Sequence, residues 1–176
     1  MWYVVQVGAG NEAHMKEILD DFLPKGLVSQ VFYPMYESSY KKNGIRQLVT
    51  KVLFPGYLFI DMEHSGESGK LGELEECLKG ITEFHHLLTV GKVCTPVSAG
   101  EQIFLARHTN TRHVMTMSRG YMINRTVTIT EGAFEGFCGE LKYVDRHNQY
   151  GIMTVKLGAQ EIDMRFGLEI VKRQSA

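Results

Sequence analysis

Residues 126–144 read Thr-Val-Thr-Ile-Thr-Glu-Gly-Ala-Phe-Glu-Gly-Phe-Cys-Gly-Glu-Leu-Lys-Tyr-Val, and this stretch decides the fold of the C-terminal part of the chain. Its first five residues are all β-branched and suit a pleated strand, and a second, alternating run follows up to Val144. Between the two runs stand Gly132, Gly136 and Gly139, which supply positive φ angles or close backbone approach. The pattern predicts a hairpin in a small curved sheet.

Length and composition describe an ordinary globular chain. With 176 residues, 44% hydrophobic and 22% charged, it can form one medium domain or two small ones. No apolar run approaches the roughly 20 residues that span a bilayer, and the N-terminus has no basic segment before an apolar one, so we expect a cytoplasmic protein without membrane contact. The three cysteines, Cys77, Cys94 and Cys138, lie far apart, which argues against a disulfide framework or a zinc ribbon.

Charge is distributed unevenly along the chain. The formal net charge is −1, but residues 1–108 carry 10 basic and 13 acidic side chains, whereas residues 109–176 carry 9 and 7. Neither part is a polyelectrolyte. Any contact with nucleic acid must therefore come from local clusters of cations.

The N-terminal part alternates strands and helices. A β-prone run, residues 2–7, ends at glycines, and Asn11 can cap a helix whose apolar stripe comprises Met15, Ile18, Leu19 and Phe22. Residues 28–33 predict the next strand. The polar stretch 37–47 has Asn43-Gly44 at its tip and predicts an exposed hairpin arm, and its cations, with one just beyond it, are Lys41, Lys42, Arg46 and Lys51.

A second informative stretch is residues 51–60, Lys-Val-Leu-Phe-Pro-Gly-Tyr-Leu-Phe-Ile, where a Pro-Gly turn precedes a strand. A helix fits residues 69–78 and a strand fits residues 81–90. Ser98 and Glu101 form a Ser-x-x-Glu capping box before a third helix. The order predicts helices packed on a mostly antiparallel sheet.

Beyond residue 108 the helical periodicity ends. We interpret residues 109–120 as a linker between an α/β sandwich, residues 1–108, and a five-stranded β-barrel, residues 121–176. The predicted barrel strands are residues 126–130, 137–144, 152–157 and 160–164, with a short one near residue 170. The fold class is therefore α+β.

These features together resemble the NusG family of transcription elongation factors. The Trp-Tyr-Val-Val strand at residue 2, the basic hairpin and the Leu-Phe-Pro-Gly-Tyr-Leu-Phe run at residues 53–59 are similar to its N-terminal NGN domain. The glycine-punctuated hairpin at residues 126–144 is similar to its KOW motif. The segments 117–120, 144–147 and 167–172 look most like the LoaP branch, which acts as antiterminators on selected operons.

The resemblance implies partners and contacts. An apolar patch would bind the clamp helices of the largest RNA polymerase subunit, and here it would comprise Tyr3, Phe54, Pro55, Tyr57, Phe59 and Phe84. Aromatic anchors on a rigid sheet suit such a contact, although a domain this small also needs aromatic residues for its core. The cations Lys41, Lys42, Arg46 and Lys51 would contact upstream or non-template DNA, or else lie on a solvated arm.

In the LoaP branch the barrel resembles a reader of a leader-RNA hairpin. The candidate RNA contacts are Arg119, Arg125, Lys142, Arg146, His147, Lys156, Arg165, Lys172 and Arg173. Two features depart from the pattern: Ala133 replaces a usual proline, and the loop Asn148-Gln149-Tyr150 is neutral. A general elongation factor, whose barrel binds a ribosomal protein or a termination factor, stays an alternative. A stand-alone RNA-binding or ribosome-associated protein is a second one.

Signs of catalysis or metal binding are absent from the sequence. His85 and His86 point to opposite faces of a strand, and neither they nor His108 and His113 have a carboxylate or cysteine at ligand spacing. The sequence contains no nucleophile elbow, phosphate loop or dinucleotide fingerprint. We therefore expect a monomeric, nonenzymatic antiterminator without cofactor or metal.

Overall fold

The computed structural model describes residues 1–62, 69–81, 86–87, 89–90, 93–94, 96–158 and 160–171. It divides into two compact units. The first, here the sandwich unit, comprises residues 1–33 and 54–102. The second, here the hairpin–barrel unit, comprises residues 34–53 and 103–176. The α+β class predicted from the sequence is confirmed. The predicted division at residues 108 and 121 stays a prediction about domains that fold independently.

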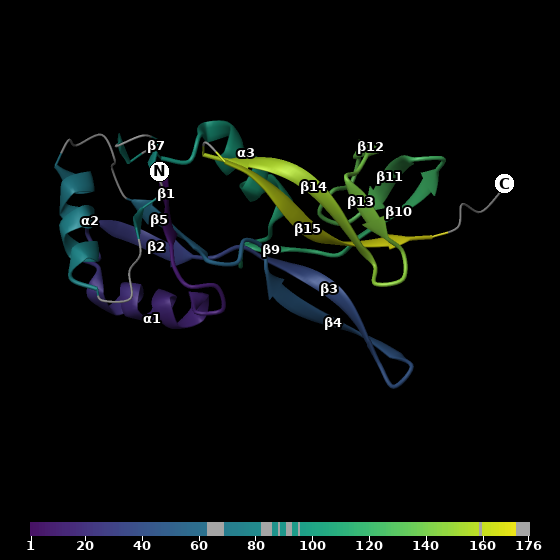
Figure 1. Cartoon of the computed structure of the whole chain (residues 1–176), viewed down its shortest axis with the longest axis horizontal. Helices are drawn as coiled ribbons and strands as arrows, with labels where there is room; N and C mark the ends of the chain where they lie inside the picture. Colours follow the sequence, from purple (N-terminus) through teal and green to yellow (C-terminus); the bar gives the residue numbers. More distant parts are fainter. Residues whose placement is uncertain are drawn as a thin grey trace. The chain divides into compact units, whose positions relative to one another are not determined.

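The sandwich unit is built on an antiparallel sheet with the strand order β2-β5-β1-β6. These strands are β1 (Trp2–Gln6), β2 (Val28–Phe32), β5 (Tyr57–Met62) and β6 (His86–Leu87). Helices α1 (Glu12–Phe22) and α2 (Lys70–Lys79) pack on the sheet, and a short hairpin of β7 (Thr89–Val90) and β8 (Val93–Cys94) follows (Figure 1). The predicted strand at residues 81–90 falls partly outside the described residues.

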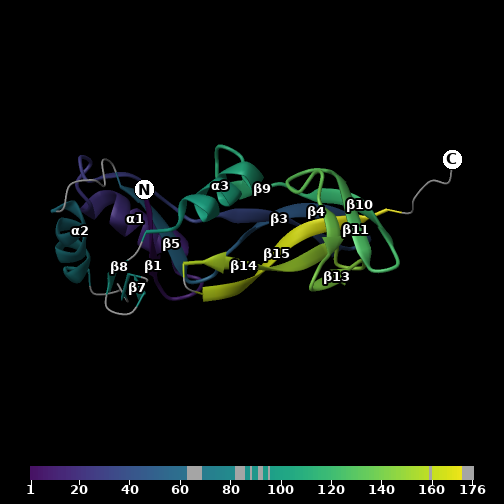
Figure 2. The ribbon, with the colours of Figure 1, turned by 90° about the horizontal axis from the view of Figure 1, so that it is seen from above.

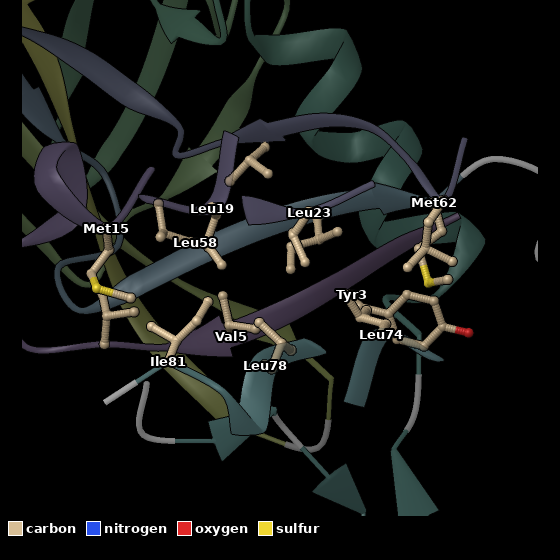
Figure 3. Packing of buried hydrophobic residues seen from close by; sticks show 14 residues of the cluster. Tyr3, Val5, Met15, Leu19, Leu23, Leu58, Met62, Leu74, Leu78 and Ile81 are labelled. Carbon is tan, nitrogen blue, oxygen red and sulfur yellow. The ribbon is translucent and has the colours of Figure 1, made fainter. Parts of the chain in front are cut away.

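Both helices pack against one face of this sheet. Met15 and Leu19 of α1 and Leu74 and Leu78 of α2 are fully buried in one cluster with Val5 and other strand residues (Figure 3). Each fully buried aliphatic side chain stabilises the fold by about 1.5–3 kcal/mol, which makes this cluster the main stabilising element of the unit. Phe22 was predicted in the stripe, but 53% of it is exposed because it lies in the last turn of the helix.

The first residues of two helices differ in how they are capped. Asn11 precedes α1 as predicted, but its side chain makes no capping hydrogen bond. At α3 (Ala99–His108) the capping box is confirmed: the Ser98 amide donates to Glu101 Oε2 at 2.8 Å, and the Glu101 amide donates to Ser98 Oγ at 3.3 Å. Both patterns therefore predicted the position of a helix start, but only the Ser-x-x-Glu pair forms the expected capping hydrogen bonds.

The hairpin–barrel unit begins with the predicted hairpin, β3 (Met35–Lys42) and β4 (Ile45–Val52). Asn43 and Gly44 have φ angles of 51° and 81°, as a two-residue primed turn requires. The rest is a six-stranded sheet with the order β12-β11-β10-β15-β14-β13. Its strands are β10 (Ser118–Ile123), β11 (Thr126–Glu131), β12 (Cys138–Glu140), β13 (Tyr143–Asp145), β14 (Tyr150–Leu157) and β15 (Gln160–Ile170).

The segment predicted as a linker differs from that expectation. It contains β9 (Val114–Met115), which pairs with β3, and the start of β10, which pairs with both β11 and β15. Met115 and Ser118 are fully buried. Met115 pairs with Tyr36 and Ser118 with Leu168, about 80 and 50 positions away in the sequence, so local spacing could not predict these two pairings. The sheet has six strands where five were predicted: β10 was not expected, residues 137–144 divide into β12 and β13, and the strand predicted near residue 170 is the end of β15.

Close backbone approach joins the hairpin to the barrel strands. A Cβ atom at Gly167 of β15 would lie 2.3 Å from the Glu37 carbonyl oxygen of β3, which is possible only without a side chain. The Glu37 carboxylate in turn accepts a hydrogen bond from the Met117 amide at 2.8 Å. Strands β3 and β15 consequently run side by side within this unit (Figure 2).

Candidate protein and nucleic-acid interfaces

The sheet of the sandwich unit carries an aromatic cluster on the face away from its helices. In the β1–β5 register Val4 pairs with Phe59, and paired residues share a face. The Phe59 ring lies 5.4 Å from Phe32 and 6.2 Å from Phe54, and Trp2 lies 5.0 Å from Phe32, all between ring centroids. We call Trp2, Phe32, Phe54 and Phe59 the aromatic face.

The patch predicted for polymerase binding divides into buried and accessible parts. Phe54 and Phe59 are 2% and 0% exposed, whereas Tyr57 is half-buried and Pro55 is exposed. Tyr3 belongs to the helix-side core instead, because its strand partner is Ile60 and alternation turns it to the opposite face. Phe84 lies outside the described residues. Among the described members of the patch, Pro55 and Tyr57 are therefore the accessible ones.

A buried carboxylate holds the turn beside this surface. Gly56 has a φ of 87°, and its amide donates to Glu12 Oε1 at 2.7 Å. The Gly10 amide donates to the same oxygen at 3.1 Å, and only 3% of Glu12 is exposed. Glu12 thereby links the start of α1 to the turn that carries Pro55.

Sequence reasoning missed three of these residues. Trp2 and Phe32 could have been found from strand alternation, because Trp2 stands two positions before Val4 and shares its face. Glu12 gave no signal, since its partner Gly56 is 44 positions away. Only the tertiary structure shows that this carboxylate is structural.

The four hairpin cations are all exposed, as a solvated arm or a phosphate-binding arm requires. Lys41 and Arg46 face each other across the hairpin. Arg46 Nη1 donates to Ser39 Oγ at 2.9 Å, and Nη2 donates to the His147 carbonyl oxygen at 3.0 Å. Arg46 is therefore held in place by the loop before β14, whereas Lys41, Lys42 and Lys51 have no ion pair in the described part of the chain.

Three of the predicted RNA contacts on the barrel are ion-paired. Arg119 Nε lies 2.9 Å from Glu169 Oε2, and Lys142 Nζ lies 2.6 Å from Asp163 Oδ2. Arg125 Nε approaches Glu140 at 3.8 Å. The hydrogen bond that Arg119 donates to Glu169 raises the pKa of Arg119, and the one that Asp163 accepts from Lys142 lowers the pKa of Asp163. Their charges are largely compensated locally, which weakens their attraction for phosphate.

The other predicted RNA contacts are uncompensated or not described. Arg146, Lys156 and Arg165 are exposed, and none forms an ion pair with a described residue. The Arg165 guanidinium lies over the Tyr150 ring, 4.0 Å from its centroid. His147 contributes its carbonyl oxygen to Arg46. Lys172 and Arg173 lie outside the described residues.

Among the described residues, no group of three His, Cys, Asp or Glu side chains is arranged to hold a metal ion. None of the described helices is long and apolar enough to cross a membrane. The described residues offer two candidate surfaces for macromolecular partners: Pro55 and Tyr57 beside the largely buried aromatic face on one unit, and exposed cations on the other.

Comparison with known proteins supplies the family. The family model described as transcription termination factor NusG matches residues 1–104. The chain is 27% identical to the transcription termination/antitermination protein NusG of Rickettsia typhi, covering 98% of this chain and 89% of that protein. It is 26% identical to the protein of the same name from Bacillus subtilis, covering 82% and 81%. A solved structure of Thermotoga maritima NusG has the same fold, with a TM-score of 0.57, 20% identity, and coverage of 96% of this chain and 93% of that one.

An α/β sandwich followed by a KOW-like β domain, with these relatives, defines a transcription termination and antitermination factor. Within this class the chain belongs to the NusG family, because the family's model matches more than half of its length.

Proposed function

We propose that this protein is a processive antiterminator of the LoaP type. It acts in the cytoplasm without catalysing a reaction: the sandwich unit binds RNA polymerase and suppresses pausing and termination, and the KOW-like barrel binds structured leader RNA. Membership of the NusG family supports the first part. The observation that carries the second part is the set of exposed, uncompensated cations Arg146, Lys156 and Arg165.

The polymerase contact centres on the turn that precedes β5. Pro55 is exposed and Tyr57 is half-buried beside the aromatic face, so a partner helix can bury apolar area on a rigid sheet. Phe54 and Phe59 support this surface from below. Truncating a central aromatic anchor typically weakens binding by more than tenfold.

A second function, a general elongation factor with a protein-binding barrel, is favoured by one observation. Arg119, Arg125 and Lys142 are engaged by acidic neighbours, which leaves the barrel less basic than its composition indicates. A weakly charged barrel with exposed Tyr143 is suited to a protein partner.

A transcription assay with RNA polymerase from the source organism separates the two functions. Templates carry an intrinsic terminator, with or without the operon's own leader. An antiterminator raises read-through only on leader templates, and Arg146→Ala/Lys156→Ala abolishes this selectivity. Tyr57→Ala lowers polymerase affinity about tenfold or more, whereas Tyr143→Ala, a matched exposed tyrosine, leaves it unchanged. Equal effects on both templates would favour the general factor.

A further inference from the structure

The hairpin and the barrel enclose a cleft of about 600 Å³ within one compact unit. The basic and aromatic residues that line it are Tyr40, Lys41, Arg46 and Lys51 of the hairpin and His147, Tyr150 and Arg165 of the barrel. The sequence analysis assigned these two groups of cations to different nucleic acids. The structure brings them together at one site.

The cleft is positively charged without local compensation. None of its lining residues is acidic, and none of its four Lys and Arg side chains forms an ion pair with a described residue. A neighbouring cleft of about 420 Å³, also lined by Arg46, contains Glu131 and Glu169 beside Arg119. A concave site lined by one sign of charge concentrates ligands of the opposite sign, so the first cleft is the one suited to phosphate.

One wall of the cleft is a stacking platform. The Arg165 guanidinium lies 4.0 Å from the Tyr150 ring centroid, and the Tyr150 and Tyr143 ring centroids lie 5.9 Å apart. The guanidinium is held by this ring and by a hydrogen bond with Tyr36, and a planar group of this kind can also stack on a nucleobase. A base can stack there only when it is unpaired, since a base in a duplex is covered by its neighbours. This favours a single strand over a double helix.

We propose that this cleft binds a single-stranded segment of RNA. Lys41, Arg46 and Lys51 hold its phosphates, and one unpaired base stacks on Arg165. The choice of RNA over DNA rests on the proposed function, in which the barrel recognises a transcript. By this proposal the hairpin cations and the barrel contact the same RNA strand. The RNA segment beside a recognised stem, such as a loop or flanking strand, is the part that enters the cleft.

The test measures binding of the full-length protein by fluorescence anisotropy across a salt series. The probes are fluorescein-labelled oligo(A) and oligo(U) 12-mers of RNA, the DNA 12-mer of the same sequence, and a blunt RNA duplex. The main variant is Lys41→Gln/Lys51→Gln, since neither lysine bonds to another described residue. The matched control is Lys16→Gln/Lys79→Gln, which removes two ion-paired lysines of the sandwich unit, one partly exposed and one exposed.

We expect the cleft double variant to weaken single-stranded RNA binding at least tenfold. The slope of log affinity against log salt should become about 1.4 less steep, because each phosphate contact to a single strand contributes about 0.7. Arg165→Lys, which keeps the charge but removes the planar group, should weaken binding about fivefold or more with the slope unchanged. The control should change affinity less than twofold.

Four results would overturn the proposal. Equal weakening by both double variants would mean that only net charge matters. Equal affinity for RNA and DNA strands would remove the assignment to RNA. Duplex binding that is tight and unaffected by the cleft variants would place RNA recognition elsewhere on the barrel, leaving the proposed function intact. Absence of RNA binding by the unaltered protein would overturn the proposed function as well.

Discussion

The buried Glu12 carboxylate offers a sharp test of how the turn beside the aromatic face is held. One of its oxygens, Oε1, accepts both the Gly56 amide at 2.7 Å and the Gly10 amide at 3.1 Å. With 3% of the residue exposed, water cannot replace the bond to Gly56. Replacing Glu12 by Ala removes the acceptor of both amides, whereas replacing it by Gln keeps one carbonyl oxygen in reach.

Glu12→Ala should lower the free energy of unfolding about twice as much as Glu12→Gln. Hydrogen bonds to a charged group contribute about 1.5–3 kcal/mol each, and the shorter, fully buried bond to Gly56 lies toward the upper end. Glu12→Ala should therefore lower the free energy of unfolding of the sandwich unit by about 4 kcal/mol. Charge-assisted hydrogen bonds are roughly twice as strong as neutral ones, so Glu12→Gln should cost about 2 kcal/mol.

The assay is urea denaturation followed by the fluorescence of Trp2, the single tryptophan of the chain, which packs on Phe32 in the sandwich unit. Amide hydrogen exchange of Gly56 provides a local readout and should accelerate most in Glu12→Ala. Glu17→Ala, an exposed residue of the same helix, is the control and should stay within about 0.5 kcal/mol. If Glu12→Ala and Glu12→Gln lowered the free energy of unfolding equally, the stabilisation could not come from one oxygen that accepts both amides.

Three further predictions concern other parts of the fold. Gly120→Ala should destabilise the barrel by about 3 kcal/mol or more, because its Cβ would lie 2.2 Å from the Thr128 carbonyl oxygen. Gly72→Ala is the control: its Cβ would lie in open space on α2, so the substitution should stabilise the helix by up to about 1 kcal/mol. Urea denaturation of both variants measures these changes. Gly44→Ala should cost about 1 kcal/mol, measured in the same way, since its φ is 81°. Burial lowers the pKa of His108 below 6.5, so on acidification this histidine takes up a proton more readily in the unfolded chain than in the folded protein. The free energy of unfolding should therefore fall as the pH drops below 6.5. His108→Leu should reduce this fall, measured by urea denaturation between about pH 7 and 5.

Local patterns in the sequence predicted much of the fold. The Asn43-Gly44 turn fixed the hairpin and its register, because this pair adopts positive φ at little cost. The stripe of Met15 and Leu19 located α1, and the capping box located α3. The hairpin of β11 and β12 likewise formed where the glycines predicted it.

Patterns that depend on distant partners were not predictable. The predicted linker, residues 109–120, included the start of β10, whose pairing with β11 is local but whose pairing with β15 joins residues about 50 positions apart. The run at residues 137–144 was expected as one strand, but it forms β12 and β13, which pair with different neighbours. Composition alone likewise could not show that Tyr3 and Phe59 face opposite sides of the same sheet.

The candidate sites likewise have features that the sequence predicted and features that only the tertiary structure shows. The sequence showed which residues carry a charge or an aromatic ring, because residue type and local spacing can be read from it without a structure. Which cations are neutralised depends on acids far away in the chain: Arg119 finds Glu169, and Lys142 finds Asp163. Ionic attraction falls off with distance in space, not along the chain, so only the tertiary structure decided that Arg165 is uncompensated and shares a cleft with the hairpin.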